Sequence, residues 1–230
     1  MPGGSSMEIH KPKPVHNWRE FASEIGVVVM GIIIALSLEA AVEAFHWRYE
    51  VHEGRDRLHN EIQGDLPVYM HRKAVASCVK DKLSSTKQII ADLTAHRHVR
   101  TVSEFESPLN GPIRHEIWTA LAAAQVLNHF PSEELGNYSR FYNDISDAEY
   151  FMDRESRAWL TLHLLSGDPN QLTNQEINAL RLAQREAEEM SSGVAFVSKS
   201  QVEVARTLKI EAPELELNKP EECTPIGRGS

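Results

Sequence analysis

The dominant pattern along this chain is an apolar stretch near its N-terminus. The run Ile25–Leu38 contains fourteen residues without a charge, and its helical phase continues into both flanks. Crossing a hydrocarbon core of roughly 30 Å takes about 20 apolar helical residues, so the run alone is short. At about 1.5 Å per residue, Trp18 and Trp47 would lie about 43 Å apart, close to the bilayer thickness with its headgroups. Tryptophan prefers that depth. We therefore expect a transmembrane anchor at residues 25–46 with an interfacial belt of Trp18 and Trp47.

Two other interpretations fit part of the same pattern. A cleaved signal peptide would use Lys11, Lys13 and Arg19 as its basic region and Val42-Glu43-Ala44 as its cleavage site. The helical phase, however, continues past that site instead of ending in turn residues. A buried helix of a soluble protein would rarely carry valine, isoleucine and methionine on every face. An uncleaved signal anchor is the interpretation we prefer.

The orientation of the anchor is predicted from the unequal lengths of its two flanks more than from their charge. Three basic residues lie on each side: Lys11, Lys13 and Arg19 before the span, and Arg48, Arg55 and Arg57 after it. A long C-terminal domain is translocated largely regardless of its charge, whereas a short basic tail tends to stay inside. We expect a single-pass protein of the bacterial inner membrane, with residues 1–24 as a short cytoplasmic tail and the C-terminal domain in the periplasm.

Helical periodicity dominates the rest of the chain. Apolar residues recur by threes, fours and sevens through Trp47, Val51, Leu58, Ile62, Leu66 and Tyr69. Proline removes a backbone donor and clashes one turn back, so Gly64 and Pro67 are expected to kink or end this helix. A second helix is expected over residues 67–95, followed by a long loop over 96–112 that is rich in proline and glycine.

Three further helices are expected after that loop. The first covers residues 113–130 and the second begins at Pro131-Ser132 and stops at Gly167. The third opens with a capping box, Thr173–Glu176, and carries an apolar stripe to Leu208. No strand-period run or internal repeat stands out. The fold class predicted for residues 47–209 is therefore all-α, with the N-terminal transmembrane helix continuing into an up-and-down helical bundle.

The C-terminal region differs in composition. Residues 210–230 contain three prolines and five glutamates, and predict an extended acidic tail. The two cysteines of the chain, Cys78 and Cys223, could close a disulfide across about 145 residues in an oxidising compartment, worth near 5 kcal/mol in the chain-entropy model. Two unrelated reduced thiols are the alternative. No CxxC pair or Cys/His cluster indicates zinc or redox chemistry.

Charge and motifs exclude several kinds of function. A net charge of −9 without a basic stripe argues against nucleic acid and against a peripheral protein held by anionic lipid. No glycine-rich phosphate loop or GxSxG elbow is present, so we predict no enzyme, no catalytic residue and no cofactor. Glu43 and His46 form an ExxH pair without the second pair that a di-iron bundle needs. His52 and His59, like His96 and His98, fit solvated polar residues, and no metal site is predicted.

One face of the anchor carries the most informative residues. Gly31, Ala35, Glu39 and Glu43 are spaced by four and share one side of a helix. The small pair Gly31 and Ala35 permits close approach of a second span. The carboxylate of Glu39 would lie about two turns below the outer boundary of the membrane, where it needs a partner or a route to the interface. The pattern predicts a membrane-packing face, and interfacial snorkelling without a partner is the alternative.

Three blocks of sequence resemble a family of uncharacterised bacterial single-pass inner-membrane proteins. The blocks are residues 10–48, Arg57–Ile62 and Ile117–Leu121, and the resemblance extends over roughly residues 9–145. It implies an N-terminal signal anchor and an extracytoplasmic helical domain. The family has no established activity, so no functional residue is carried over.

Two functions are compatible with these patterns. The first is a non-enzymatic periplasmic interaction protein that contacts membrane lipid and associates through its span, as a homo-oligomer or as an accessory subunit of a larger membrane complex. The second is a sensory module that binds a small molecule between the Trp118 and Trp159 helices. The first is favoured, because about 24 residues before the span cannot form a signalling output domain.

Overall fold

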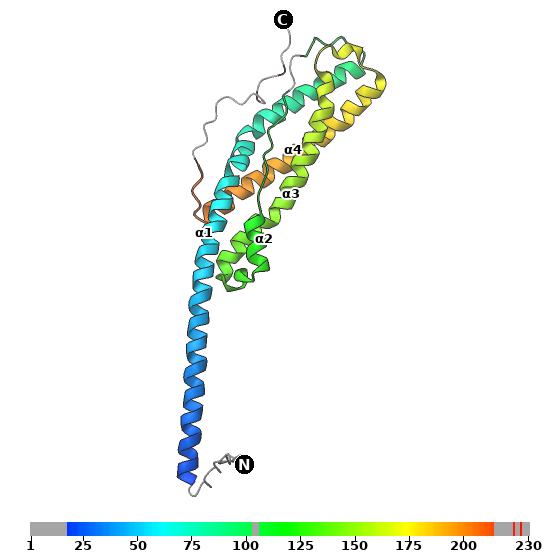
Figure 1. Ribbon diagram of the computed structural model, residues 1–230. Coiled ribbons are helices and arrows are strands. Elements are labelled where there is room, and N and C mark those ends of the chain that lie inside the picture. The colour runs from blue at the N-terminus through cyan, green and yellow to red at the C-terminus, as the bar shows by residue number, and fades with distance from the viewer. Residues whose placement is uncertain (1–17, 103–105, 214–222, 224–225, 227–230) are drawn as a thin grey trace, which may run out of the picture. The chain divides into compact units, whose positions relative to one another are not determined.

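The computed structural model describes residues 18–102, 106–213, 223 and 226, and these residues form an all-α fold (Figure 1). The long helices are α1 (Trp18–Thr94), α3 (Ser132–Leu162) and α4 (Asn174–Thr207), and α2 (Glu116–Ala123) is short. Within residues 18–102 and 106–213 there are also three 3-10 turns: η1 (Val126–His129), η2 (His163–Leu165) and η3 (Pro169–Gln171). The only extended pairing in this described part is an isolated bridge between Val102 and Gly167. The all-α prediction is confirmed.

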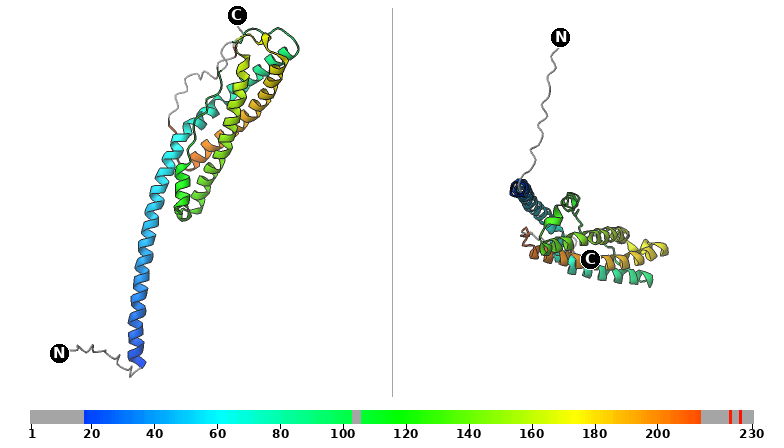
Figure 2. Two further views of the ribbon diagram at one scale, coloured as in Figure 1. Left: turned by 45° about the vertical axis from the view of Figure 1, so that its right-hand side comes forward. Right: turned by 90° about the horizontal axis from the view of Figure 1, so that it is seen from below.

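The chain divides into two compact units, residues 1–49 and residues 50–230. The described part of the first unit is the N-terminal portion of α1. The second unit contains the remainder of α1 with the other helices. Three long helical segments lie side by side in it: residues 50–94 of α1, all of α3 and all of α4 (Figure 2).

The direction of the three helices follows from their pairwise contacts. His59 and Arg72 of α1 contact Tyr138 and Glu155 of α3, so these two helices run in the same direction. Helices α3 and α4 are antiparallel, because Phe141 near the start of α3 contacts Gln201 near the end of α4, while Arg154 further along α3 contacts Glu186 earlier in α4. A parallel pair needs a return connection, and the segment 95–115 provides it; its described residues, 95–102 and 106–115, are not helical.

The helix does not end at Pro67, because α1 continues through it to Thr94 and includes the second helix expected over residues 67–95. Proline inside a helix costs about 3 kcal/mol. Its neighbours Leu66 and Tyr69 are fully buried, and each such side chain contributes roughly 1.5–3 kcal/mol, so packing outweighs the defect. Gly64 does not break the helix either. A Cβ atom there would collide with the guanidinium of Arg114, so this glycine leaves room for a neighbouring side chain.

The predicted apolar stripes form the core of the bundle. Every member of the last stripe is buried: Leu180, Ala183, Ala187, Met190, Val194, Val197, Val204 and Leu208. The same holds for the second stripe on α1: Val75, Val79, Leu83, Ile90 and Leu93. The capping box is confirmed, since Thr173 Oγ1 accepts from the Glu176 amide while the Glu176 carboxylate accepts from the Thr173 amide.

Two predicted helix boundaries move. The helix expected over residues 113–130 begins only at Glu116, and Gln125 interrupts it with a φ of 61°. The helix expected to stop at Gly167 ends at Leu162 and continues as a short 3-10 turn. Gly167 has a φ of 96° and exchanges two backbone hydrogen bonds with Val102, so it joins the return segment instead of capping α3 directly.

Candidate functional site

The N-terminal portion of α1 is a helix that could cross a membrane by its length and composition, and none of its apolar window is buried. Side chains on all its sides are exposed, including Val27, Leu38 and Phe45, each about two thirds or more. Helices that are apolar all round are normally enclosed by other protein or by lipid. The exposed apolar surface of this segment therefore needs an environment other than water.

The predicted membrane-packing face lies on this segment. Gly31, Ala35, Glu39 and Glu43 are all exposed. A Cβ atom at Gly31 would meet nothing within 4 Å, so no other part of the described chain covers this side of the helix.

The two belt tryptophans differ in their surroundings. Trp18 is 77% exposed, with its ring 6.0 Å from that of Phe21. Trp47 is half-buried, and its indole Nε1 donates to Glu43 Oε1 at 3.3 Å. The Glu43 carboxylate thus has a donor on its own helix one turn away, which distinguishes it from Glu39 on the same face.

The structure joins Cys78 and Cys223 through a disulfide, with a Cα–Cα distance of 5.3 Å. Both cysteines and the nearby Ile226 pack against the apolar cluster formed by α1, α3 and α4. Where the chain leaves α4, Gln63 Nε2 donates to the carbonyl of Glu211. The tail beyond α4 is therefore attached to α1 at two described positions, one covalent.

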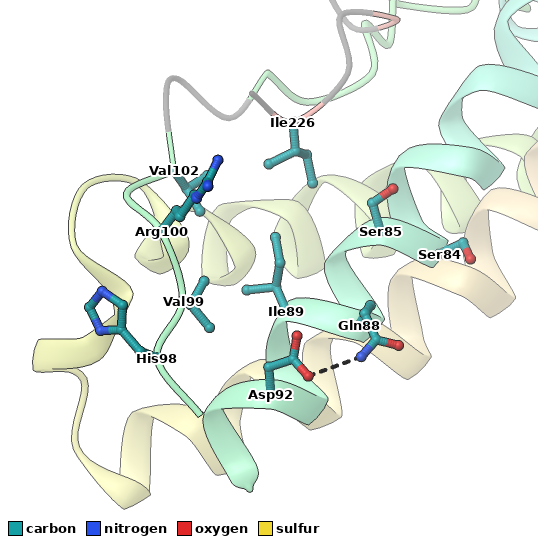
Figure 3. A pocket seen from close by; sticks show the side chains of 10 residues that line it. All are labelled: Ser84, Ser85, Gln88, Ile89, Asp92, His98, Val99, Arg100, Val102 and Ile226. Carbon is teal, nitrogen blue, oxygen red and sulfur yellow. Dashed lines mark hydrogen bonds between the residues drawn. The ribbon is translucent and has the colours of Figure 1, made fainter. Parts of the chain in front are cut away.

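A pocket of about 580 Å³ lies beside the tethered tail (Figure 3). Ile89 of α1 and Ile226 of the tail point toward one another across it, with Val99 beside them. The carboxylate of Asp92 accepts from Gln88 Nε2 at the α1 edge. The titratable residues of the pocket lining are Asp92, His98 and Arg100.

A buried ion pair holds α1 against α3. Arg72 Nη2 donates to both carboxylate oxygens of Glu155 at 2.7 Å, and the side chains are 3% and 0% exposed. Asn110 of the return segment donates to the Met152 carbonyl and to Ser156 Oγ beside this pair. Removing one member of such a pair leaves a buried charge without its partner, which is strongly destabilising. The pair and Asn110 therefore hold α1, α3 and the return segment in one alignment.

Two carboxylates of α1 hold the start of α2. Asp65 accepts from the backbone amide and from Nε of Arg114, both at 3.0 Å. Glu61 accepts from the Ile117 amide at 2.9 Å and from the Tyr142 hydroxyl at 2.7 Å. Burial raises the pKa of the Asp65 carboxyl, while the hydrogen bonds from Arg114 act in the opposite direction. The Ile117 amide is one of the backbone groups that α2 leaves unpaired at its start, whereas the Arg114 amide lies just before the helix.

Sequence reasoning missed these buried charges, although one signal was present. Arg72 lies three residues after Tyr69 and three before Val75, and therefore on the apolar stripe of α1. A charge at a stripe position indicates a buried partner. The partner itself, Glu155, lies 83 residues further along the chain.

The other candidate chemistries are not brought together. Trp118 stacks on Tyr142 at 4.8 Å, whereas Trp159 is buried 17 residues further along α3, about 26 Å on a helix axis. The two tryptophans therefore do not line a common pocket. Across the described ranges, no group of three or more histidine, cysteine, aspartate or glutamate side chains could hold a metal ion. His59 packs near Tyr138, and burial lowers its pKa.

Comparison with known proteins adds no relative: no family model, no curated protein and no solved structure matches the chain. The resemblance stated from the sequence blocks therefore stays a prediction.

Proposed function

We propose that this protein is a non-enzymatic interaction protein, anchored in the bacterial inner membrane by α1 and exposing its helical bundle to the periplasm. One observation carries the proposal. The chain buries its apolar stripes thoroughly within residues 50–213, yet it leaves the apolar side chains of Ile25–Leu38 exposed on every side of α1. A lipid bilayer is the environment that stabilises such a helix.

Two further features support this location and orientation in the inner membrane. The disulfide between Cys78 and Cys223 is a type of bond that persists in the oxidising periplasm and is rare in the cytosol. The basic residues Lys11, Lys13 and Arg19 fit a short N-terminal tail retained in the cytoplasm. Together they favour an orientation with the N-terminus inside and the bundle outside.

Topology is tested directly on the full-length protein. The intact mass of membrane-extracted protein should correspond to an uncleaved chain, and a mass starting at Phe45 would rule out the anchor. Alkaline phosphatase fused at the C-terminus should be active. A fluorescent protein that fails to fold after export should be dark in the same position.

Association through the span is the second part of the proposal, as a homo-oligomer or within a larger membrane complex. Gly31 and Ala35 leave one side of the helix open for close backbone approach. Glu39 on that side directly follows the uncharged run, within the expected anchor 25–46, where a carboxylate is costly unless a neighbouring chain supplies a hydrogen-bond donor or a cation. A partner helix would satisfy both features.

Variants of this face test the association. Gly31→Leu or Ala35→Leu should weaken it, because added bulk separates the two backbones. Ala40→Leu adds the same bulk on the opposite side of the helix and is the matched control. Glu39→Gln should preserve a homo-oligomer, since an amide still forms hydrogen bonds, but weaken a charge-paired complex. Crosslinking and size analysis in detergent measure the effect. If every variant associates like the parent protein, lipid covers this face.

A further inference from the structure

A groove runs along the bundle between α1 and α4. Two adjoining cavities of about 560 and 470 Å³ form it, and both are lined by Lys87 of α1 and Glu188 of α4. On α1 the groove extends from Ala76 to Thr94, a length of about 27 Å at 1.5 Å per residue, and Ala95 lines it just beyond the helix end. This length matches a helix of about 20 residues.

The walls of the groove carry small side chains. Ser77 and Ala91 of α1 are exposed along it, as are Ala95 just after α1 and Ser192 of α4. Small residues let a helix approach to the 8–10 Å axial separation that is typical of packed helices. The groove thus provides a surface on which a fourth helix can pack against the three long helices of the bundle.

The edges of the groove are basic. Four cations line it, namely Lys80, Lys87, Arg181 and Arg185, against the single carboxylate of Glu188. Lys87 and Glu188 form an ion pair at 3.3 Å, which leaves an excess of three positive charges. The chain as a whole has a net charge of −9, so this concentration of cations is local. Complementary charge selects an acidic partner and suppresses a basic one.

A buried amide also lines the groove. Gln184 is 4% exposed, and its Nε2 donates to the carbonyl of Leu83 at 2.8 Å. Its Oε1 has no hydrogen-bond partner within the described part of the chain. Buried polar atoms in folded proteins are nearly always paired, so this oxygen is an acceptor left unsatisfied in the wall of the groove.

The acidic tail of the same chain has two described hydrogen-bonded or covalent attachments to α1, and both lie away from the groove. Its described attachment points on α1 are Gln63 and Cys78, which lie on one side of the helix. Lys80 follows Cys78 by two residues and so lies about 200° around the helix axis from it. These two attachment points therefore lie on the opposite flank of α1 from Lys80.

We propose that the groove between α1 and α4 binds an acidic amphipathic α-helix of a partner protein as the fourth helix of the bundle. Its contact face would carry small and apolar residues, and its flanks would carry aspartate or glutamate. This deepens the proposed function by naming the class of partner, and it rests on that function only in taking the protein to act by association.

The test measures peptide binding to the full-length, detergent-solubilised protein by fluorescence anisotropy. The probe is a fluorescein-labelled helical peptide of about 20 residues with alanine and leucine on one face and glutamate on both flanks. The comparison peptide has lysine in place of every glutamate. The glutamate peptide should bind at least about tenfold more tightly, and added salt should reduce the difference.

Matched variants locate the binding. Lys80→Glu combined with Arg185→Glu should weaken binding of the glutamate peptide by about tenfold or more, while Arg157→Glu on α3 should not. Ala91→Trp fills the groove and should also weaken binding, whereas Ala123→Trp at the exposed end of α2 should not.

Three results would overturn the inference: equal binding of the two peptides, unchanged binding in the groove variants, or equal binding of a short DNA duplex that the same variants abolish. The last would identify a general anion-binding surface. Gly31→Leu should leave peptide binding unchanged. A failure of the proposed association through the span can therefore be distinguished from a failure of the proposed peptide binding in the groove.

Discussion

Breaking the disulfide between Cys78 and Cys223 should lower the free energy of unfolding by about 2–5 kcal/mol. The bond closes a loop of 145 residues in the unfolded chain. In the chain-entropy model, a loop of that length destabilises the unfolded state by about 5 kcal/mol relative to the open chain. This is the full effect if the folded protein is unchanged when the bond is broken.

The lower end of the range applies if the tail leaves the bundle. Ile210 is buried at the end of α4, and Cys223 lies about 13 residues further along. The disulfide closes that short segment against α1 in the folded protein too, at an entropic cost of about 3 kcal/mol. If breaking the bond releases this segment, the folded state regains that entropy and is stabilised by about 3 kcal/mol. The free energy of unfolding would then fall by only about 2 kcal/mol. The measured value therefore reports whether Ile226 and its neighbours hold the tail without the bond.

The assay is urea unfolding of the full-length protein in detergent, followed by the fluorescence of Trp118 and Trp159. The Cys78→Ser/Cys223→Ser variant is compared with the oxidised protein, and the reduced wild-type protein should match the variant. Reductant should not affect the variant itself. A loss below about 1 kcal/mol would contradict the loop-entropy reasoning. Two thiols that react with an alkylating agent in the unreduced protein would contradict the bridge.

Three further predictions concern the bundle. Glu155→Gln should lower the free energy of unfolding by about 3–5 kcal/mol, because it leaves the Arg72 guanidinium buried without its carboxylate. The double variant Arg72→Met/Glu155→Leu should lose much less stability. Equal losses in urea unfolding would refute this account of the pair. Burial lowers the pKa of His59, so the unfolded chain binds a proton first as pH falls, and stability should decrease below about pH 6.5. His59→Gln should flatten that part of the profile, and a retained slope would assign it to other groups. Thr173→Ala should cost about 1 kcal/mol by removing the helix cap, while Thr173→Ser should cost little in the same unfolding assay.

Local patterns in the sequence determined most of the helical structure. The stripe from Leu180 to Leu208 is buried as predicted, because a period of 3.6 residues places its members on one face whatever that face packs against. The capping box at Thr173 is equally local, since both of its hydrogen bonds lie within four residues. The apolar segment Ile25–Leu38 is likewise evident from composition alone.

Tertiary structure decided the features that depend on distant partners. Pro67 remains inside α1 because residues on both sides of it are buried against other helices, and local propensity alone would have ended the helix there. The path of the return segment depends on Asp65, Lys82 and Glu155, which contact groups 24 to 49 residues away in sequence. A one-dimensional pattern reports which residues face inward and contains no information about which distant groups meet. That pairing is settled by the packing of α1, α3 and α4, and so are the groove between α1 and α4 and the buried pair of Arg72 and Glu155.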